Sequence, residues 1–167
     1  MKKVFVIAIL TALLITGVSI TVLSQKTPEK PVYVAQTENI PLNADTIFNL
    51  VNAEREKAGI KPLVRDARLD ATAQARADDM VARDYFSHND PVTGENMVNI
   101  LNGQKHCRDA SENISNAIYE KPDMSASVVD SWILSKPHHD AILLADYDLA
   151  GIGMNGTKIA FHFCNLK

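Results

Sequence analysis

The stretch LAGIGMNGTKIAFHFC, residues 149–164, decides the fold class. Two short strand-like runs, Leu149–Met154 and Lys158–Cys164, are joined by Asn155-Gly156. Asn-Gly between two such runs is the strongest short-range signal of a β-hairpin. Helical patterns precede the hairpin. Helices that come first and a hairpin that comes last predict an α+β class, with helices packed around a small antiparallel sheet.

Three segments ahead of the hairpin carry apolar residues at helical spacing, at about residues 44–58, 67–84 and 123–135. Asn43 or Asp45 can cap the first helix, Asp66 the second, and Asp123 or Ser125 the third. The side chains expected to face the core are those of Ile47, Leu50, Val51, Ala58, Leu69, Ala73, Ala77, Met80, Val81, Val128, Val129, Trp132 and Ile133. The charged side chains expected to face solvent include those of Glu54, Arg55, Glu56, Lys57, Asp78, Asp79, Arg83 and Asp84.

The remaining segments are less clearly patterned. Residues 95–101 predict one or two helical turns, and residues 140–144 predict another. Residues 112–119 are compatible with a short strand or with a helix, and their pattern does not decide between them. Pro137 is expected to end the third helix, because proline cannot continue one.

The overall charge excludes one class of partner. The chain has 167 residues and a formal net charge of −3, with its lysines and arginines scattered. Nucleic-acid binding usually needs a clustered basic face. We therefore expect no nucleic-acid partner and a mixed, solvated surface.

The N-terminus predicts a location outside the cytoplasm. Lys2 and Lys3 precede an almost unbroken apolar run, Val4–Leu23. Such a run is long enough to cross a membrane as a helical anchor, and it also resembles a secretory signal peptide. We favour the anchor, because residues 22–24 make a poor cleavage site; basic residues on the short side predict a cytoplasmic N-terminus. The predicted organisation is an anchor or signal at 1–24, a proline-containing extended linker at 25–43 and one domain at 44–167.

Two cysteines fit that location. Cys107 and Cys164 are the only cysteines of the chain. In an oxidising compartment an isolated pair is interpreted first as a disulfide, and two buried thiols are the alternative. Because Cys164 lies near the C-terminus, a disulfide there would prevent fraying of the chain end.

Two histidines and a carboxylate form the candidate site. His88, Glu112 and His138 each lie at the edge of an apolar element. Two imidazoles, a carboxylate and a water form a recurring zinc site, so these three residues suit zinc or another divalent cation if folding brings them together. Their spacing matches no compact metal-binding motif. The alternative is that Glu112 pairs with a histidine to satisfy a polar core. His162 is a further cleft candidate if Cys164 faces the interior, because both lie on one face of a strand; a strand histidine is more often exposed or bonded to a neighbour.

The order and spacing of these pieces resemble the CAP superfamily (cysteine-rich secretory, antigen 5, pathogenesis-related 1) in its short bacterial, SCP-like extracellular form. The resemblance covers about residues 47–163. The residues that carry it are Leu50, Val51, Asn52, Arg55, Leu63, Leu69, Ala73, Ala77, Phe86-Ser87-His88, Glu112-Asn113-Ile114, Trp132, Ser135, His138, Gly151-Ile152-Gly153 and Phe163.

The resemblance implies an α-β-α sandwich with a cleft lined by two histidines and acidic residues. His88, Glu112 and His138 match the cleft positions, and family members bind zinc or other divalent ions there. The chain departs from the family pattern in three places. Lys136-Pro137 replaces the usual Pro-Gly before the second histidine, Ser111 replaces the usual Gly before Glu-Asn, and Ala160-Phe161 replaces the usual Thr-Gln of the last strand.

Two functions from different classes follow. The first is an extracytoplasmic binding module, anchored by its N-terminal helix or secreted after cleavage, whose cleft holds a divalent metal or a small ligand. A lipid, a wall fragment or a partner protein would then be its ligand. The second is a metal-dependent hydrolase or peptidase that uses zinc-bound water with Glu112 as ligand or base. The sequence has no Gly-x-Ser-x-Gly elbow, and it does not establish that the protein is an enzyme.

Overall fold

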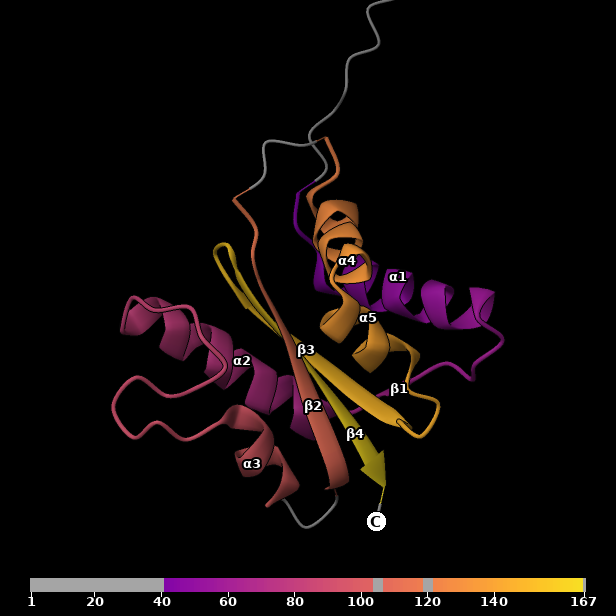
Figure 1. The fold of residues 1–167 in the computed structure, drawn as a ribbon. Helices are drawn as coiled ribbons and strands as arrows, with labels where there is room; N and C mark the ends of the chain where they lie inside the picture. The colour runs from indigo at the N-terminus through magenta and orange to yellow at the C-terminus, as the bar shows by residue number, and fades with distance from the viewer. Residues whose placement is uncertain (1–40, 104–106, 119–121, 167) are drawn as a thin grey trace, which may run out of the picture. The chain divides into compact units, whose positions relative to one another are not determined.

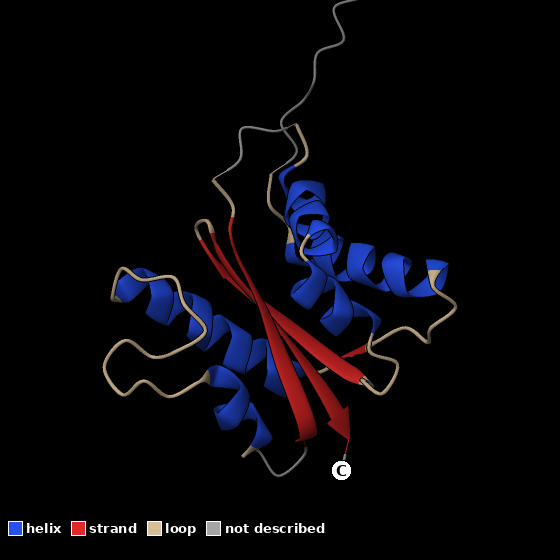
Figure 2. Cartoon of the chain, in the orientation of Figure 1, coloured by secondary structure: helices blue, strands red, loops and turns tan. Residues whose placement is uncertain are grey.

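The computed structural model of the chain describes residues 41–103, 107–118 and 122–166. These residues contain one sheet and five helices, shown in Figures 1 and 2. The predicted anchor and most of the predicted linker lie outside the described residues. The elements are α1 (Ala44–Lys57), β1 (Val64–Arg65), α2 (Ala67–Ala82), α3 (Met97–Asn102), β2 (Cys107–Asn116), α4 (Met124–Leu134), α5 (Lys136–Leu143), β3 (Leu149–Asn155) and β4 (Lys158–Leu166).

The strands form one sheet in the order β1-β3-β4-β2. The predicted hairpin is confirmed: β3 and β4 are antiparallel, with Asn155 opposite Lys158. β2 pairs antiparallel with β4, and the short β1 is the one parallel strand of this sheet. The undecided segment after residue 111 is therefore a strand, and β2 is an edge of the sheet.

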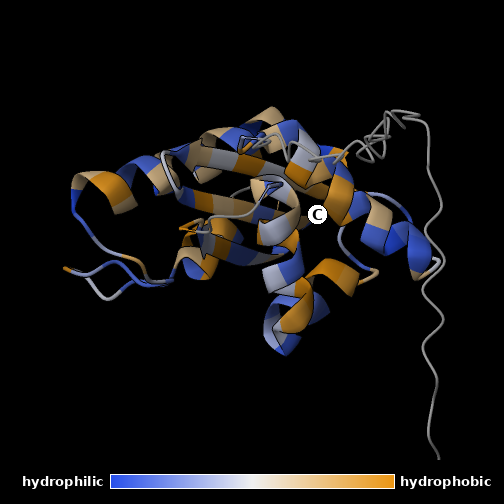
Figure 3. Ribbon diagram, turned by 90° about the horizontal axis from the view of Figure 1, so that it is seen from above, coloured by the Kyte–Doolittle hydropathy of each residue, from blue (hydrophilic) through white to orange (hydrophobic). Residues whose placement is uncertain are grey.

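Helices cover the sheet on both faces, so the predicted α-β-α sandwich is confirmed (Figure 1). α2 and α3 lie on one side, and α1, α4 and α5 on the other. Hydrophobic and hydrophilic residues alternate along the helices, as expected when one side of each packs on the sheet (Figure 3). Trp132 and Phe161 form the centre of the larger core, with ring centroids 5.9 Å apart. Ala73, Ile114 and Ala160 pack together on the α2 side.

α2 packs directly on the backbone of β3. A Cβ atom at Gly151 would lie 2.2 Å from the backbone nitrogen of Asp70, and one at Gly153 would lie 2.0 Å from that of Gln74. Real Cβ contacts are never so close, so only glycine permits this approach. The Asp70 carboxylate also accepts a hydrogen bond from the backbone N–H of Ile152, at 2.8 Å. α2 is thereby fixed against the strand next to β4.

The predicted caps are confirmed. The side chains of Asn43, Asp66 and Asp123 accept hydrogen bonds from the first turns of α1, α2 and α4. Pro137 was predicted to end the third helix, but α4 already ends at Leu134. Pro137 lies in the first turn of α5, where its missing N–H has no intrahelical partner to lose.

The disulfide prediction is confirmed. Cys107 at the start of β2 and Cys164 in β4 are bonded, with a Cα–Cα distance of 5.5 Å and a sequence separation of 57. Both cysteines are fully buried. The disulfide therefore joins the edge strand that carries Glu112 to the central strand that carries His162.

Three predicted exposures are wrong. Arg55 was expected in solvent but is fully buried, and its guanidinium binds backbone carbonyls of four residues. Ala58 and Val81 were expected in the core but are exposed. Both lie at helix ends, where one side of the last turn is open to solvent. Among the helices of the described residues, none has the length and hydropathy required to cross a membrane.

Candidate functional site

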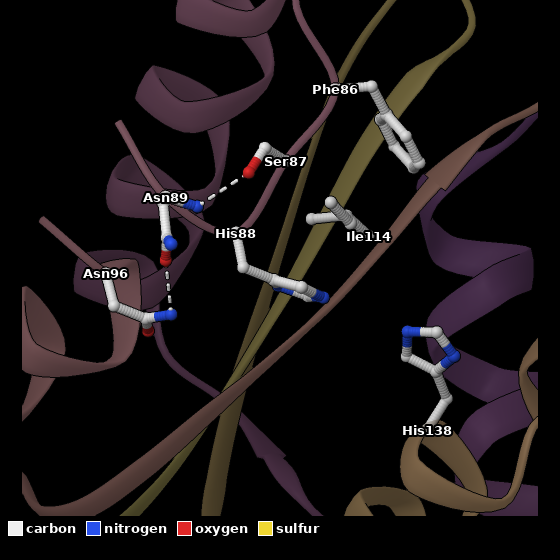
Figure 4. Close-up of a pocket in the computed structure, with 7 residues that line it drawn as sticks. All are labelled: Phe86, Ser87, His88, Asn89, Asn96, Ile114 and His138. Atoms are coloured by element: carbon white, nitrogen blue, oxygen red, sulfur yellow. Dashed lines mark hydrogen bonds between the residues drawn. The ribbon is translucent and has the colours of Figure 1, made fainter. Parts of the chain in front are cut away.

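A groove follows the free edge of β2 between the two helical layers. It consists of three cavities of about 480, 260 and 230 Å³, all of which are lined by His138; we call them together the β2 groove. β2 contributes residues 111–116 to its floor. His88 comes from the segment between α2 and α3, and His138 comes from α5. Figure 4 shows the two rings on opposite sides of the cavity.

Glu112 lies at the centre of the site and does not point into the groove. Its side chain has no solvent exposure. One carboxylate oxygen lies 2.7 Å from Nδ1 of His88. The other lies 3.2 Å from Nε2 of His162 and 3.3 Å from Nε of Arg76. Burial alone would raise the pKa of Glu112, but the hydrogen bonds with His162 and His88, together with the charges of His162 and Arg76, lower it to about 2. Glu112 is therefore an ionised, fully engaged acceptor at neutral pH.

His162 lies behind Glu112 and away from the cavities. It is fully buried, and its Nδ1 lies 2.9 Å from the hydroxyl oxygen of Thr72 on α2. Both sheet faces are covered by helices, so both faces of β4 are buried, and strand alternation does not expose this histidine. His162 thus belongs to the cluster that supports the site, through Glu112, and is not one of the residues that line the groove.

His88 is oriented by Glu112. Its side chain is partly exposed, and its Nδ1 is held by a carboxylate that can only accept. We assign the Nδ1 proton to this hydrogen bond. The second ring nitrogen, Nε2, is then left for the groove. The sequence prediction that these two residues meet agrees with the structure.

His138 is oriented by Ser135 in a comparable way. The Ser135 hydroxyl lies 2.8 Å from Nδ1 of His138 and does not cap α5, although Ser135 is its N-cap residue. The side-chain amide of Asn113 in β2 also donates to the backbone carbonyl of His138, at 3.1 Å. Burial, and then the charge of nearby His88, lower the pKa of His138. The two rings have centroids 6.2 Å apart and planes inclined by 38°.

Sequence reasoning missed Arg76, which completes the buried charge cluster. Arg76 is 3% exposed, and its terminal nitrogens donate to the Tyr85 hydroxyl, at 2.6 Å, and to the Ser87 carbonyl. The signal was present, because Arg76 shares the buried row of α2 with Ala73 and Met80. A charge in such a row usually has a buried partner. By its bond to Ser87, Arg76 also fixes the residue next to His88.

Other polar residues take no part in the groove. His139 contacts Glu54 of α1, with 3.3 Å between its Nε2 and the carboxylate, and is not among the groove residues. His106 lies outside the described residues. Trp132 is a core residue, as predicted, and its indole N–H donates to the Ile114 carbonyl at 3.0 Å. The Ser87 hydroxyl accepts from the backbone N–H of Asn89, and among the described residues it has no hydrogen bond to a histidine or a carboxylate.

The predicted three-residue metal site is not assembled by this arrangement. Within the part of the chain that the structure describes, no group of three or more His, Cys, Asp or Glu side chains is placed to hold one ion. His88 and His138 face each other, but both Glu112 oxygens are engaged behind His88. Metal binding by the groove remains a prediction.

Comparisons with known proteins agree with this architecture. The model of the cysteine-rich secretory protein family, CAP, matches residues 48–164. A Bacillus subtilis protein named YkwD, described as uncharacterized, is 33% identical over 107 residues, which are 64% of this chain and 40% of that protein. An uncharacterized membrane protein of the same organism, YlbC, is 29% identical over 65% of this chain and 30% of its own length. The chain thus matches less than half of either relative.

Solved structures show the same fold. An extracellular protein of Bacillus anthracis that contains an SCP domain superposes with a TM-score of 0.63 and 24% identity, over 73% of this chain and 40% of that one. An outer surface protein of Borrelia burgdorferi gives a TM-score of 0.63 and 19% identity, over 74% of this chain and 92% of that one. At these identities the likeness concerns the fold alone.

Proposed function

Because the chain belongs to the cysteine-rich secretory protein (CAP) family, we propose that it is an extracytoplasmic binding module whose ligand site is the β2 groove between His88 and His138. The location is supported by the disulfide between Cys107 and Cys164, a bond that persists in oxidising compartments. The N-terminal apolar run and the extracellular relative of known structure point the same way.

One observation carries the proposal: the Nδ1 atom of each groove histidine is hydrogen-bonded to another side chain of the protein. Glu112 holds that of His88 and Ser135 holds that of His138. Both Nε2 atoms are then left for a shared ligand, on rings 6.2 Å apart. Two imidazoles fixed in this way, on the opposite layers of one fold, form a preorganised site.

These residues fit a divalent cation such as zinc. Imidazole nitrogen is a common zinc ligand, and a carboxylate behind a histidine is the usual support of such a ligand. Zinc would supply a centre that attracts an anionic or carbonyl group of a ligand. His88 and His138 would hold the ion, while Glu112 and Ser135 would keep both rings in place.

The hydrolase alternative is less well supported by the position of Glu112. A general base must reach a water in the groove. The Glu112 side chain is unexposed, both of its oxygens are engaged, and its lowered pKa leaves little basicity at neutral pH. Binding without catalysis therefore agrees better with the geometry.

The test is zinc titration of the purified full-length protein by calorimetry. We expect one zinc ion per chain in the wild type and at least a tenfold weaker Kd in His88→Ala and His138→Ala, as for loss of a metal ligand or its support. His139→Ala is the matched control, since His139 is the neighbour of His138 but contacts Glu54. Equal zinc affinity in all three variants, or no zinc binding by the wild type, would contradict the proposed site.

A further inference from the structure

The edge of β2 presents free main-chain groups to the groove. Alternate residues of an edge strand point their N–H and C=O groups away from the neighbouring strand. Ala117 continues the ladder by donating to the Thr157 carbonyl, so its odd-numbered neighbours in β2 bond to β4. Glu112 and Ile114 therefore face outwards. The bond from the Trp132 indole to the Ile114 carbonyl confirms this alternation.

The open part of this edge is at Glu112. The residue is 6% exposed although its side chain has no exposure, so the accessible atoms are main-chain atoms. In the described chain, no side chain or loop is hydrogen-bonded to the N–H or C=O of Glu112. Further along the edge, the Ile114 and Asn116 carbonyls are occupied by Trp132 and by the Ile118 N–H. Strand pairing is thus possible at Glu112 and blocked beyond Ile114.

The two histidines limit what can lie there. A chain that passed between the rings would need a van der Waals contact of about 3.5–4.0 Å on each side, or about 7 Å in all. The ring centroids of His88 and His138 are 6.2 Å apart. An oxygen that hydrogen-bonds to both rings needs only about 2.8 Å to each ring nitrogen and fits between them, whereas a continuous polypeptide in van der Waals contact does not. A segment paired with Glu112 must therefore end at the histidines.

Building on the proposed function, we propose that the β2 groove binds the C-terminal end of an extended polypeptide. The last peptide groups pair with the main chain of Glu112, and the terminal carboxylate lies at His88 and His138. Added strands and captured C-terminal carboxylates are both established modes of peptide recognition. Since the carboxylate lies on the Ile114 side of Glu112, the bound segment runs parallel to β2.

The surroundings suit this ligand. The cavity of about 260 Å³ beside Glu112 has apolar walls formed by Val98, Pro137 and Ala141, which suit the side chains of the last residues. Among the described residues that line the groove, Glu112 is the one carboxylate, and its charge is enclosed by His88, His162 and Arg76. A terminal carboxylate therefore meets imidazole nitrogens, or an ion that they hold, and no exposed negative side chain.

The test uses an N-acetylated random library of L-hexapeptides, once with a free C-terminal carboxylate and once as the C-terminal amide. Binding to the full-length protein is followed by NMR. We expect free-acid peptides to shift the backbone amide signals of Glu112 and Ile114, and the amides to bind at least tenfold more weakly. Val98→Arg, which fills the cavity beside Glu112, should remove peptide binding. Val92→Arg is the control, because Val92 is 82% exposed and does not line the groove.

Three results would overturn the inference. They are equal binding of acids and amides, signal shifts confined to residues outside the groove, and no binding of the free-acid library at about 1 mM. Zinc binding without peptide binding would refute this inference and leave the proposed function in place. Peptide binding without zinc binding would refute the proposed metal site and leave this inference in place, because pairing with the main chain of Glu112 does not need an ion.

Discussion

Replacing Arg55 by methionine removes the buried cation that joins α1 to the end of α5 and to the segment that precedes β3. The Arg55 guanidinium donates to the carbonyls of Lys61, Ile142, Leu144 and Tyr147, at 2.9, 2.7, 2.9 and 3.1 Å. Burial lowers the pKa of Arg55, and the charge of Asp148 partly offsets this. Arginine nevertheless remains protonated at neutral pH.

The expected cost follows from the carbonyls that lose their donor. In Arg55→Met the side-chain volume is largely kept, so a large cavity is not expected. The bonds to the Ile142 and Tyr147 carbonyls are buried, while the other two are partly accessible to water. A buried acceptor without a partner costs about 1–3 kcal/mol, so two cost about 2–6 kcal/mol. Domains typically have a free energy of unfolding of about 5–15 kcal/mol, so this loss is a large part of the total stability.

The assay is urea unfolding of the oxidised protein at pH 7, followed by circular dichroism. We expect the free energy of unfolding of Arg55→Met to fall by about 4 kcal/mol. Lys57→Met is the matched control on the same helix; its side chain is 74% exposed, and we expect a change within about 0.5 kcal/mol. A loss below about 1 kcal/mol in Arg55→Met would refute the assignment of these four bonds as a structural anchor.

Two further predictions concern the disulfide and Glu112. Reduction of the Cys107–Cys164 bond, or its replacement by two serines, should lower the free energy of unfolding by about 4 kcal/mol for a loop of 57 residues, as measured by urea unfolding with and without reductant; equal stability of the fully reduced protein would contradict this. Folding lowers the pKa of Glu112 from its ordinary 4.5 to about 2. The ionised carboxylate therefore stabilises the fold by about 3 kcal/mol above about pH 4.5. This stabilisation is lost as the pH falls from about 4.5 through about 2. The acid dependence of unfolding should therefore be weaker in Glu112→Gln, and identical pH profiles of the two proteins would argue against the ionised cluster.

The fold was predictable where its signals are local. The Asn155-Gly156 hairpin and the caps Asn43 and Asp66 are short-range features, and they are confirmed. β2 could not be decided, because helices cover both faces of the sheet and buried positions do not alternate along it. β1 has two residues, too few for any pattern. The prediction for Pro137 was wrong because proline occurs both just after the end of a helix and in the first turn of the next one, and the sequence does not distinguish the two positions.

The sequence predicted which residues belong to the site, but it did not predict which atoms their side chains contact. His88, Glu112 and His138 were identified from their positions and from the family resemblance, and the structure brings them to one groove. The direction of the Glu112 carboxylate depends on Arg76 and His162, which come from different elements, so no local pattern gives it. Arg76 could have been recognised from its place in the buried row of α2.

The division of the candidate site between two helical layers explains why the packing of this fold bears on the proposed function. His88 is held from the α2 side, by Glu112 and by the bond of Arg76 to the neighbouring Ser87. His138 belongs to the other layer and is attached to β2 through Asn113. The distance between the imidazoles is therefore set by how each layer lies on the sheet. The contact of α2 with Gly151 and Gly153 fixes one layer, and the bonds of Arg55 to the end of α5 fix the other. A substitution at either contact should move one ring relative to the other, although neither contact touches the groove.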